Sequence, residues 1–136
     1  MRRDAKLDRI AQVPLFARCS KRELGQIGAL ADEVDLPEGT VAVREGGYGQ
    51  EFFVLVSGAA EVSKQGKVVA TLGAGDWFGE IALLHNAPRN ATVTATTPIQ
   101  ALVVSHRDFS SLLSTSPQIQ AKILQALAER LAPTSF

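Results

Sequence analysis

At 136 residues the chain has the length of one domain with its own hydrophobic core, and a single domain over residues 1–136 is expected. Lysine plus arginine and aspartate plus glutamate both number 14, so the formal net charge is zero, which argues against nucleic acid or a membrane surface as a direct partner. The single cysteine, Cys19, excludes an intramolecular disulfide, and no N-terminal apolar stretch has the length of a signal peptide or membrane span, so a cytoplasmic location is expected.

The first part of the chain, residues 1–32, is predicted to form two short helices. Apolar residues recur on one side of residues 4–12, as in an amphipathic helix. Ser20 and Glu23 then have the spacing of a capping box, which marks the start of a second helix. Leucine and isoleucine follow at helical intervals, so this helix is expected to turn one face toward a core.

Residues 33–104 are predicted to form a β-roll. Short apolar or alternating runs are separated by turn residues at spacings of roughly 8 to 12 residues, which is typical of a sandwich or jelly roll. Residues 65–67 are expected to form a tight hairpin turn. The predicted fold class is therefore mainly β with flanking helices, a jelly roll or double-stranded β-helix. The expected strands cover residues 41–43, 51–56, 61–64, 68–72, 91–96 and 99–104.

Two further helices are predicted in residues 105–132. Ser105 can cap a helix over about residues 106–114, and the Ser-Pro pair at 116–117 favours the start of another. Apolar residues within 119–131 fall at helical spacing. Helices at both ends of the chain should therefore pack against or beneath the roll.

The most informative segment runs from Phe78 to Val93, because it sets one acid and one base nine residues apart among small and apolar residues. Gly79 opens a stretch expected to form a short helix, whose first N–H groups can bind an anion. Arg89 can donate two parallel hydrogen bonds to phosphate oxygens, and Glu80 can accept one from a hydroxyl such as that of a ribose. The segment therefore suits a small anion that carries a hydroxyl.

Taken alone, Glu80 and Arg89 are also compatible with a surface ion pair. The two histidines, His85 and His106, have no cysteine or carboxylate cluster beside them at metal-ligand spacing. No nucleophile and base pair or paired carboxylates are evident either. We therefore expect no metal, no cofactor and no catalysis, and His85 is expected to face solvent.

The run over residues 78–93 resembles the phosphate-binding cassette of the cyclic nucleotide-binding domain family. That family provides the regulatory module of catabolite-activator-type transcription factors, cyclic-nucleotide-dependent kinases and cyclic-nucleotide-gated channels. Its approximate pattern, Phe-Gly-Glu-(Leu/Ile)-Ala-Leu, a spacer and Pro-Arg-x-Ala-(Thr/Ser)-Val, is reproduced here with Asn90 in the variable position. Segments similar to those of the family extend from Pro14 to Leu131, which is nearly the whole chain.

The resemblance implies a role for each part of the cassette. Glu80 would bind the ribose 2′-OH and Arg89 the cyclic phosphate, while neighbouring backbone completes the cradle. Apolar strand side chains would contact the base, and Arg130 would belong to a lid formed by the last helix. Thr134 falls in the corresponding helix-end run, but Pro133 disfavours a regular helix there. The implied ligand-binding residues are Gly79, Glu80, Ile81, Ala82, Arg89, Asn90, Ala91, Val62, Val69 and Arg130.

The predicted function is a bacterial, cytoplasmic sensor of a cyclic nucleotide, with cAMP favoured over cGMP, in which binding moves the C-terminal helix. The nucleotide is an allosteric ligand, so no cofactor is expected, and the effector protein or domain would lie outside this chain. The alternative is a protein-interaction or dimerisation module of the same fold that binds no nucleotide. The oligomeric state is left open.

Overall fold

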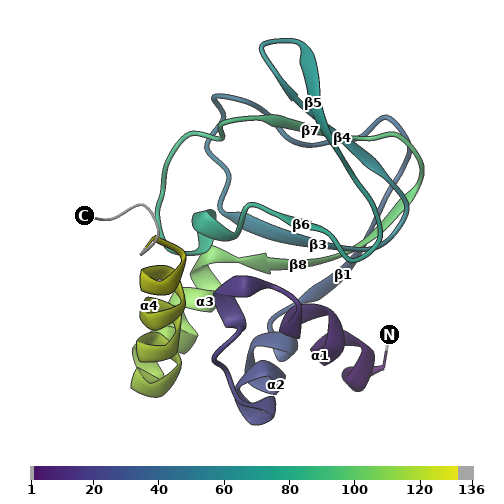
Figure 1. The fold of residues 1–136 in the computed structure, drawn as a ribbon. Helices are drawn as coiled ribbons and strands as arrows, with labels where there is room; N and C mark the ends of the chain where they lie inside the picture. The colour runs from purple at the N-terminus through teal and green to yellow at the C-terminus, as the bar shows by residue number, and fades with distance from the viewer. Residues whose placement is uncertain (1, 132–136) are drawn as a thin grey trace.

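The computed structural model describes residues 2–131, with side chains through residue 129. Within this range eight strands form two four-stranded sheets, and the helices from both ends of the chain gather on one side of them (Figure 1). The strand orders are β1-β8-β3-β6 and β2-β7-β4-β5, and the paired strands are antiparallel. The predicted class, mainly β with flanking helices, is therefore confirmed.

The predicted helices and strands form in the expected order, together with two strands and one 3₁₀ helix that were not expected. The strands are β1 (Asp32–Leu36), β2 (Val41–Val43), β3 (Glu51–Ser57), β4 (Ala60–Lys64), β5 (Lys67–Leu72), β6 (Trp77–Phe78), β7 (Thr92–Ala95) and β8 (Ile99–Ser105). The helices are α1 (Arg3–Ala11), α2 (Lys21–Ala29), α3 (His106–Thr115) and α4 (Pro117–Leu131), with the 3₁₀ helices η1 (Pro14–Phe16) and η2 (Glu80–Leu83).

One hydrophobic core lies between the helices and the sheet that contains β3 and β8. Phe16, Phe52 and Phe109 are fully buried there, and the ring of Phe16 lies 6.0 Å from that of Phe52 and 5.8 Å from that of Phe109. Ile119 and Ile123 bring α4 onto the same cluster. The aromatic rings therefore join η1, β3 and α3 at one point, and α4 packs beside them.

A second core fills the interior of the roll. Phe53 and Leu55 of β3 face Val93 of the opposite sheet, and the ring of Phe53 stacks on Phe78 at 4.7 Å. Because successive side chains of a strand point to opposite faces, β3 sends Phe52 to the helices and Phe53 into the roll. This strand therefore forms the wall between the two cores.

Two of the predicted helix starts are confirmed by their side-chain caps. Ser20 Oγ accepts a hydrogen bond from Glu23 N–H at 3.2 Å, and the Glu23 carboxylate accepts from Ser20 N–H at 2.7 Å, which completes the capping box of α2. Ser105 Oγ accepts from Asp108 N–H at 3.2 Å at the start of α3. The hairpin between β4 and β5 also forms as predicted, with positive φ at Gln65 and Gly66.

The C-terminal helix α4 is held against the N-terminal part of the chain by two ion pairs. Lys122 pairs with Glu23 of α2, and Glu129 pairs with Arg18, which follows η1. Of the apolar residues predicted at helical spacing, Ile119 and Ile123 are buried and Leu127 is partly buried, whereas Leu124 is 62% exposed. The last helix therefore docks through one face and leaves Leu124 on the other.

Candidate functional site

The predicted cassette begins with a tight turn at Gly79. Gly79 has the left-handed conformation, with φ of 81°, and opens the 3₁₀ helix η2, whose first hydrogen bond runs from Ala82 N–H to Gly79 O at 3.0 Å. Ala82 and Leu83 are buried, whereas Ile81 is largely exposed. The short helix expected from the sequence therefore forms, and it is a 3₁₀ turn rather than an α-helix.

The far end of η2 is joined to helix α3 by a histidine. His106, the first residue of α3, bonds Leu83 O through Nδ1 at 2.8 Å, and its Nε2 lies 3.2 Å from Ser110 Oγ. His106 N–H also donates to Gln50 O at 2.7 Å. This link could not be predicted from the sequence, because Leu83 and His106 are far apart in the chain. The expectation for the other histidine is met, since His85 is exposed.

Backbone hydrogen bonds place Arg89 beside a glycine-rich loop. Arg89 N–H donates to Gly47 O at 2.8 Å, and Arg89 O accepts from Gly46 N–H at 2.7 Å. Next to this pair of bonds, Tyr48 and Pro88 form an isolated antiparallel bridge. The loop between β2 and β3 therefore fixes the position of the Arg89 backbone.

The Arg89 side chain is only 8% exposed and has few partners for a buried cation. Its Nη2 donates to Glu51 O at 2.7 Å and lies 3.7 Å from the Glu51 carboxylate, while its buried Nε has no hydrogen-bond partner among the described residues. Burial lowers the pKa of the Arg89 guanidinium, and the nearby Glu51 carboxylate opposes that shift. A buried guanidinium with unused donors is suited to bind an anion.

Arg89 also reaches the opening of η2. A Cβ atom placed on Gly79 would lie 2.6 Å from Arg89 Nη1, so the guanidinium rests directly against this glycine. The acid and the base singled out in the sequence thus border one pocket of about 370 Å³. The pocket is lined by Gly79, Glu80, Ile81, Ala82, His85, Ala87, Pro88, Arg89 and Asn90.

The remaining predicted ligand-binding residues lie outside this pocket. Ala91 is buried directly after its lining residues. Val62 packs against the core of the roll, and Val69 is 56% exposed, at the point in β5 where the pairing with β4 shifts register. The side chain of Arg130 and the whole of Thr134 fall outside the described part of the chain. The base contacts expected of these residues therefore stay predictions.

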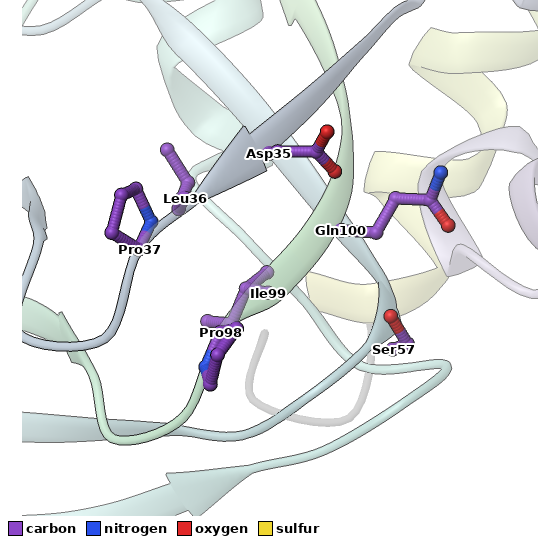
Figure 2. Close-up of a pocket in the computed structure, with 7 residues that line it drawn as sticks. All are labelled: Asp35, Leu36, Pro37, Ser57, Pro98, Ile99 and Gln100. Carbon is purple, nitrogen blue, oxygen red and sulfur yellow. The ribbon is translucent and has the colours of Figure 1, made fainter.

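A second pocket, of about 500 Å³, lies where β1 and β3 end and β8 begins. Asp35 and Gln100 are register partners on β1 and β8, and Pro37, Pro98 and Ile99 provide apolar surface (Figure 2). Its lining includes no lysine or arginine, and its one charged residue, Asp35, would repel a phosphate. An anionic ligand is therefore better matched by the cassette pocket.

Residues 2–131 contain neither a metal-ligand cluster nor a helix suited to a membrane. No group of three or more histidine, cysteine, aspartate or glutamate side chains in this range is placed to hold a metal ion. None of the helices there combines the length and the apolar character that a bilayer crossing needs.

Sequence comparison relates the chain to proteins that respond to cyclic nucleotides. The family described as "Cyclic nucleotide-binding domain" matches residues 33–116. The chain is 41% identical over 107 residues to a cAMP-dependent protein kinase regulatory subunit of Yarrowia lipolytica, covering 76% of this chain and 28% of that protein. It is 37% identical over 121 residues to a cyclic nucleotide-gated potassium channel of Rhizobium etli, covering 89% of this chain and 34% of that protein. The chain thus spans about a third or less of these relatives.

Solved structures give the same relationship. The N-terminal domain of a transcriptional regulator from Streptomyces coelicolor matches with a TM-score of 0.87 and 28% identity, covering 94% of this chain and 95% of that one. The cAMP-bound PfPKA-R matches with a TM-score of 0.70 and 30% identity, covering 93% of this chain and 46% of that one. With the family match over more than half of its length, the chain belongs to the cyclic nucleotide-binding domain family.

Proposed function

We propose that the domain is a sensor that binds a cyclic nucleotide in the cassette pocket, with cAMP favoured over cGMP. The observation that carries this proposal is the buried Arg89 guanidinium lying against Gly79 at the start of η2. There it would bind the cyclic phosphate, and Glu80 would accept a hydrogen bond from the ribose hydroxyl. The cAMP-bound relative supports the choice of ligand.

Fewer observations support cAMP over cGMP than support a cyclic nucleotide as the class of ligand. Asn90 is exposed at the edge of the pocket and carries both a donor and an acceptor, which could bond the phosphate or a base edge. Val62, Val69 and Arg130 are retained as proposed base contacts because the family resemblance assigns that role to their positions. The nucleotide acts as an allosteric ligand in this proposal, so no cofactor is required.

Binding would be passed to the helices through η2. The Leu83 carbonyl at the end of η2 is bonded to His106, which begins α3, and α3 leads directly into α4. A nucleotide that moves η2 therefore acts on α3 without an intermediate element. A ligand shifts such an equilibrium only by binding the two arrangements with different affinity, so the closed arrangement must add contacts to the nucleotide.

The wider role is also a proposal. A regulatory and non-catalytic role in the cytoplasm is supported by the likeness to a kinase regulatory subunit, and the effector protein or domain would lie outside this chain. A bacterial origin stays a prediction, because the relatives include both fungal and bacterial proteins. The alternative role as an interaction module is favoured by one observation, the exposure of Leu124 on the outer face of α4.

Calorimetric titration of nucleotide-stripped protein with cAMP and with cGMP tests the proposal. Saturable heat with cAMP is expected, and Arg89→Ala should weaken the affinity by about 10- to 150-fold, the equivalent of roughly 1.5–3 kcal/mol for one charge-assisted hydrogen bond. Glu80→Ala should have a similar or smaller effect. No heat and no thermal shift at millimolar nucleotide would leave the interaction module as the function.

A further inference from the structure

The Arg89 guanidinium lies against a second glycine, Gly49, which belongs to the loop before β3. A Cβ atom placed on Gly49 would lie 2.7 Å from Arg89 Nε, 2.8 Å from Nη2 and 3.2 Å from Cζ. Attractive contacts between heavy atoms have their optimum at about 3.5–4.0 Å, so an added methyl group would overlap the guanidinium. The guanidinium can therefore keep this position only if residue 49 has no side chain.

The backbone conformation gives no separate reason for glycine at this position. Gly49 is not among the residues of the described chain that have positive φ, whereas Gly46 and Gly79 are. A positive φ is therefore not what requires glycine at this position. What Gly49 provides is the space that the Arg89 side chain occupies.

The space beside Gly49 allows the Arg89 guanidinium to make two other contacts. Nη2 donates to Glu51 O at 2.7 Å, and Nη1 rests against Gly79. A methyl group on residue 49 would meet the same Nη2 that makes the bond to Glu51, so the guanidinium would have to leave this acceptor to avoid it. It would then leave the position beside Gly79 at which a phosphate is to be bound.

We propose that Gly49 is a positioning residue for nucleotide binding, because it provides the seat that holds the Arg89 guanidinium between Glu51 O and Gly79. The inference rests on the proposed function and adds to it a residue that does not line the cassette pocket. A seated guanidinium needs no reorganisation when the phosphate arrives, which preserves affinity that a displaced side chain would lose. No signal in the sequence connects Gly49 with Arg89, which lies far along the chain.

The test compares Gly49→Ala with Gly73→Ala in the full chain. Gly73 also lacks a positive φ, and a Cβ there would meet nothing within 4 Å, so it reports the effect of an added methyl without a clash. Gly49→Ala is expected to weaken cAMP affinity by about tenfold or more, and Gly73→Ala to leave it unchanged. Equal affinities of the two variants would overturn the seat and leave the proposed function intact.

A double-mutant cycle with Arg89→Ala separates positioning from a general structural effect. If Gly49 acts through Arg89, the Gly49→Ala change has no further effect on affinity once the guanidinium is removed. If it costs the same affinity in the Arg89→Ala background, the inference is wrong, because residue 49 then acts independently of Arg89.

The seat of the Arg89 guanidinium can also be tested without nucleotide, so the inference is testable even if the chain binds none. The Nε–H group of Arg89 is buried and should give a resolved signal in a proton–nitrogen correlation spectrum, assigned by its loss in Arg89→Ala. Gly49→Ala should shift or broaden this signal, and Gly73→Ala should not. An unchanged signal in Gly49→Ala would refute the seat, whereas absent binding with a shifted signal would refute only the proposed function.

Discussion

The chemistry of individual side chains in this domain depends on the neighbours that surround them in the fold. Cys19 shows this as clearly as Arg89 does. Burial raises the pKa of the Cys19 thiol to about 11, with a further increase from the nearby Glu23 carboxylate and an opposing effect of Lys122. The thiol is therefore kept protonated at neutral pH, and it is poorly suited to act as a nucleophile.

Cys19 should react slowly with a chromogenic disulfide reagent in the native protein. With its pKa raised from 9.0 to about 11, the thiolate fraction near pH 8 falls by roughly a hundredfold relative to an unperturbed thiol. The reaction followed by absorbance in buffer and in denaturing urea should show at least this ratio of rates. Equal rates in both solutions would contradict the raised pKa.

The site could be predicted from the sequence only where its functional residues lie close together in the chain. Glu80 and Arg89 belong to one short run, so their residue types and spacing were enough to indicate an anion with a hydroxyl. Gly49 and Glu51 contribute through a steric fit and a backbone carbonyl, which depend on how a distant loop approaches Arg89. Neither property has a residue-type signature, so both appear only in the folded chain.

At the scale of elements, α4 is attached to the rest of the domain by contacts of two kinds. Ile119 and Ile123 bury its inner face, while Lys122 pairs with Glu23 of α2. The hydrogen bond from Lys122, followed by that from Ser20 N–H, holds the pKa of the Glu23 carboxyl below its ordinary value. The carboxylate therefore stabilises both the start of α2 and the docking of α4.

Glu23 should make part of the stability of the domain dependent on pH. Its folded pKa is lower than its unfolded one, so its contribution is fully present above the ordinary glutamate value of 4.5 and is lost as the pH falls through the folded value. Glu23→Gln should lower the free energy of unfolding by about 1–3 kcal/mol near pH 7 and by less near pH 3.

Urea unfolding of both proteins at the two pH values provides the measurement. Glu38→Gln is the matched control, because Glu38 is exposed in the turn between β1 and β2. A Glu23→Gln deficit that does not shrink in acid would show that the contribution of Glu23 is not electrostatic.

Elements were predictable from the sequence when local signals and tertiary contacts agreed. The capped helices and the hairpin at Gln65 and Gly66 carry their own signals, and they form as predicted. Strand β1 was not among the expected strands, because Asp32, Glu33 and Asp35 make its sequence resemble a polar loop. It forms because β8 supplies an antiparallel partner along its whole length, which is a tertiary effect.

At the scale of the whole molecule, β3 makes the helices and the roll parts of one structure. Val54 on one face of this strand belongs to the core beneath the helices, and Leu55 on the other face belongs to the core of the roll. Both side chains are about 1% exposed. Loss of either core therefore removes the support of the strand on which the other depends.

Substitutions on the two faces of β3 should shift the same unfolding transition. Leu55→Ala should cost about 2–5 kcal/mol and Val54→Ala about 1–3 kcal/mol, through lost burial and the cavity left behind. In each variant, Trp77 fluorescence and far-ultraviolet circular dichroism should report one midpoint in urea. Midpoints that separate for either variant would mean that the helices and the roll unfold independently.

The joint between η2 and α3 has a consequence for how far α3 can move on its own. Because the Leu83 carbonyl can only accept, His106 Nδ1 must carry a hydrogen, and in the neutral ring Nε2 accepts from the Ser110 hydroxyl. The ring is therefore a strut of fixed tautomer between the two elements, so the first turn of α3 cannot rotate about the helix axis without breaking its bond to Leu83.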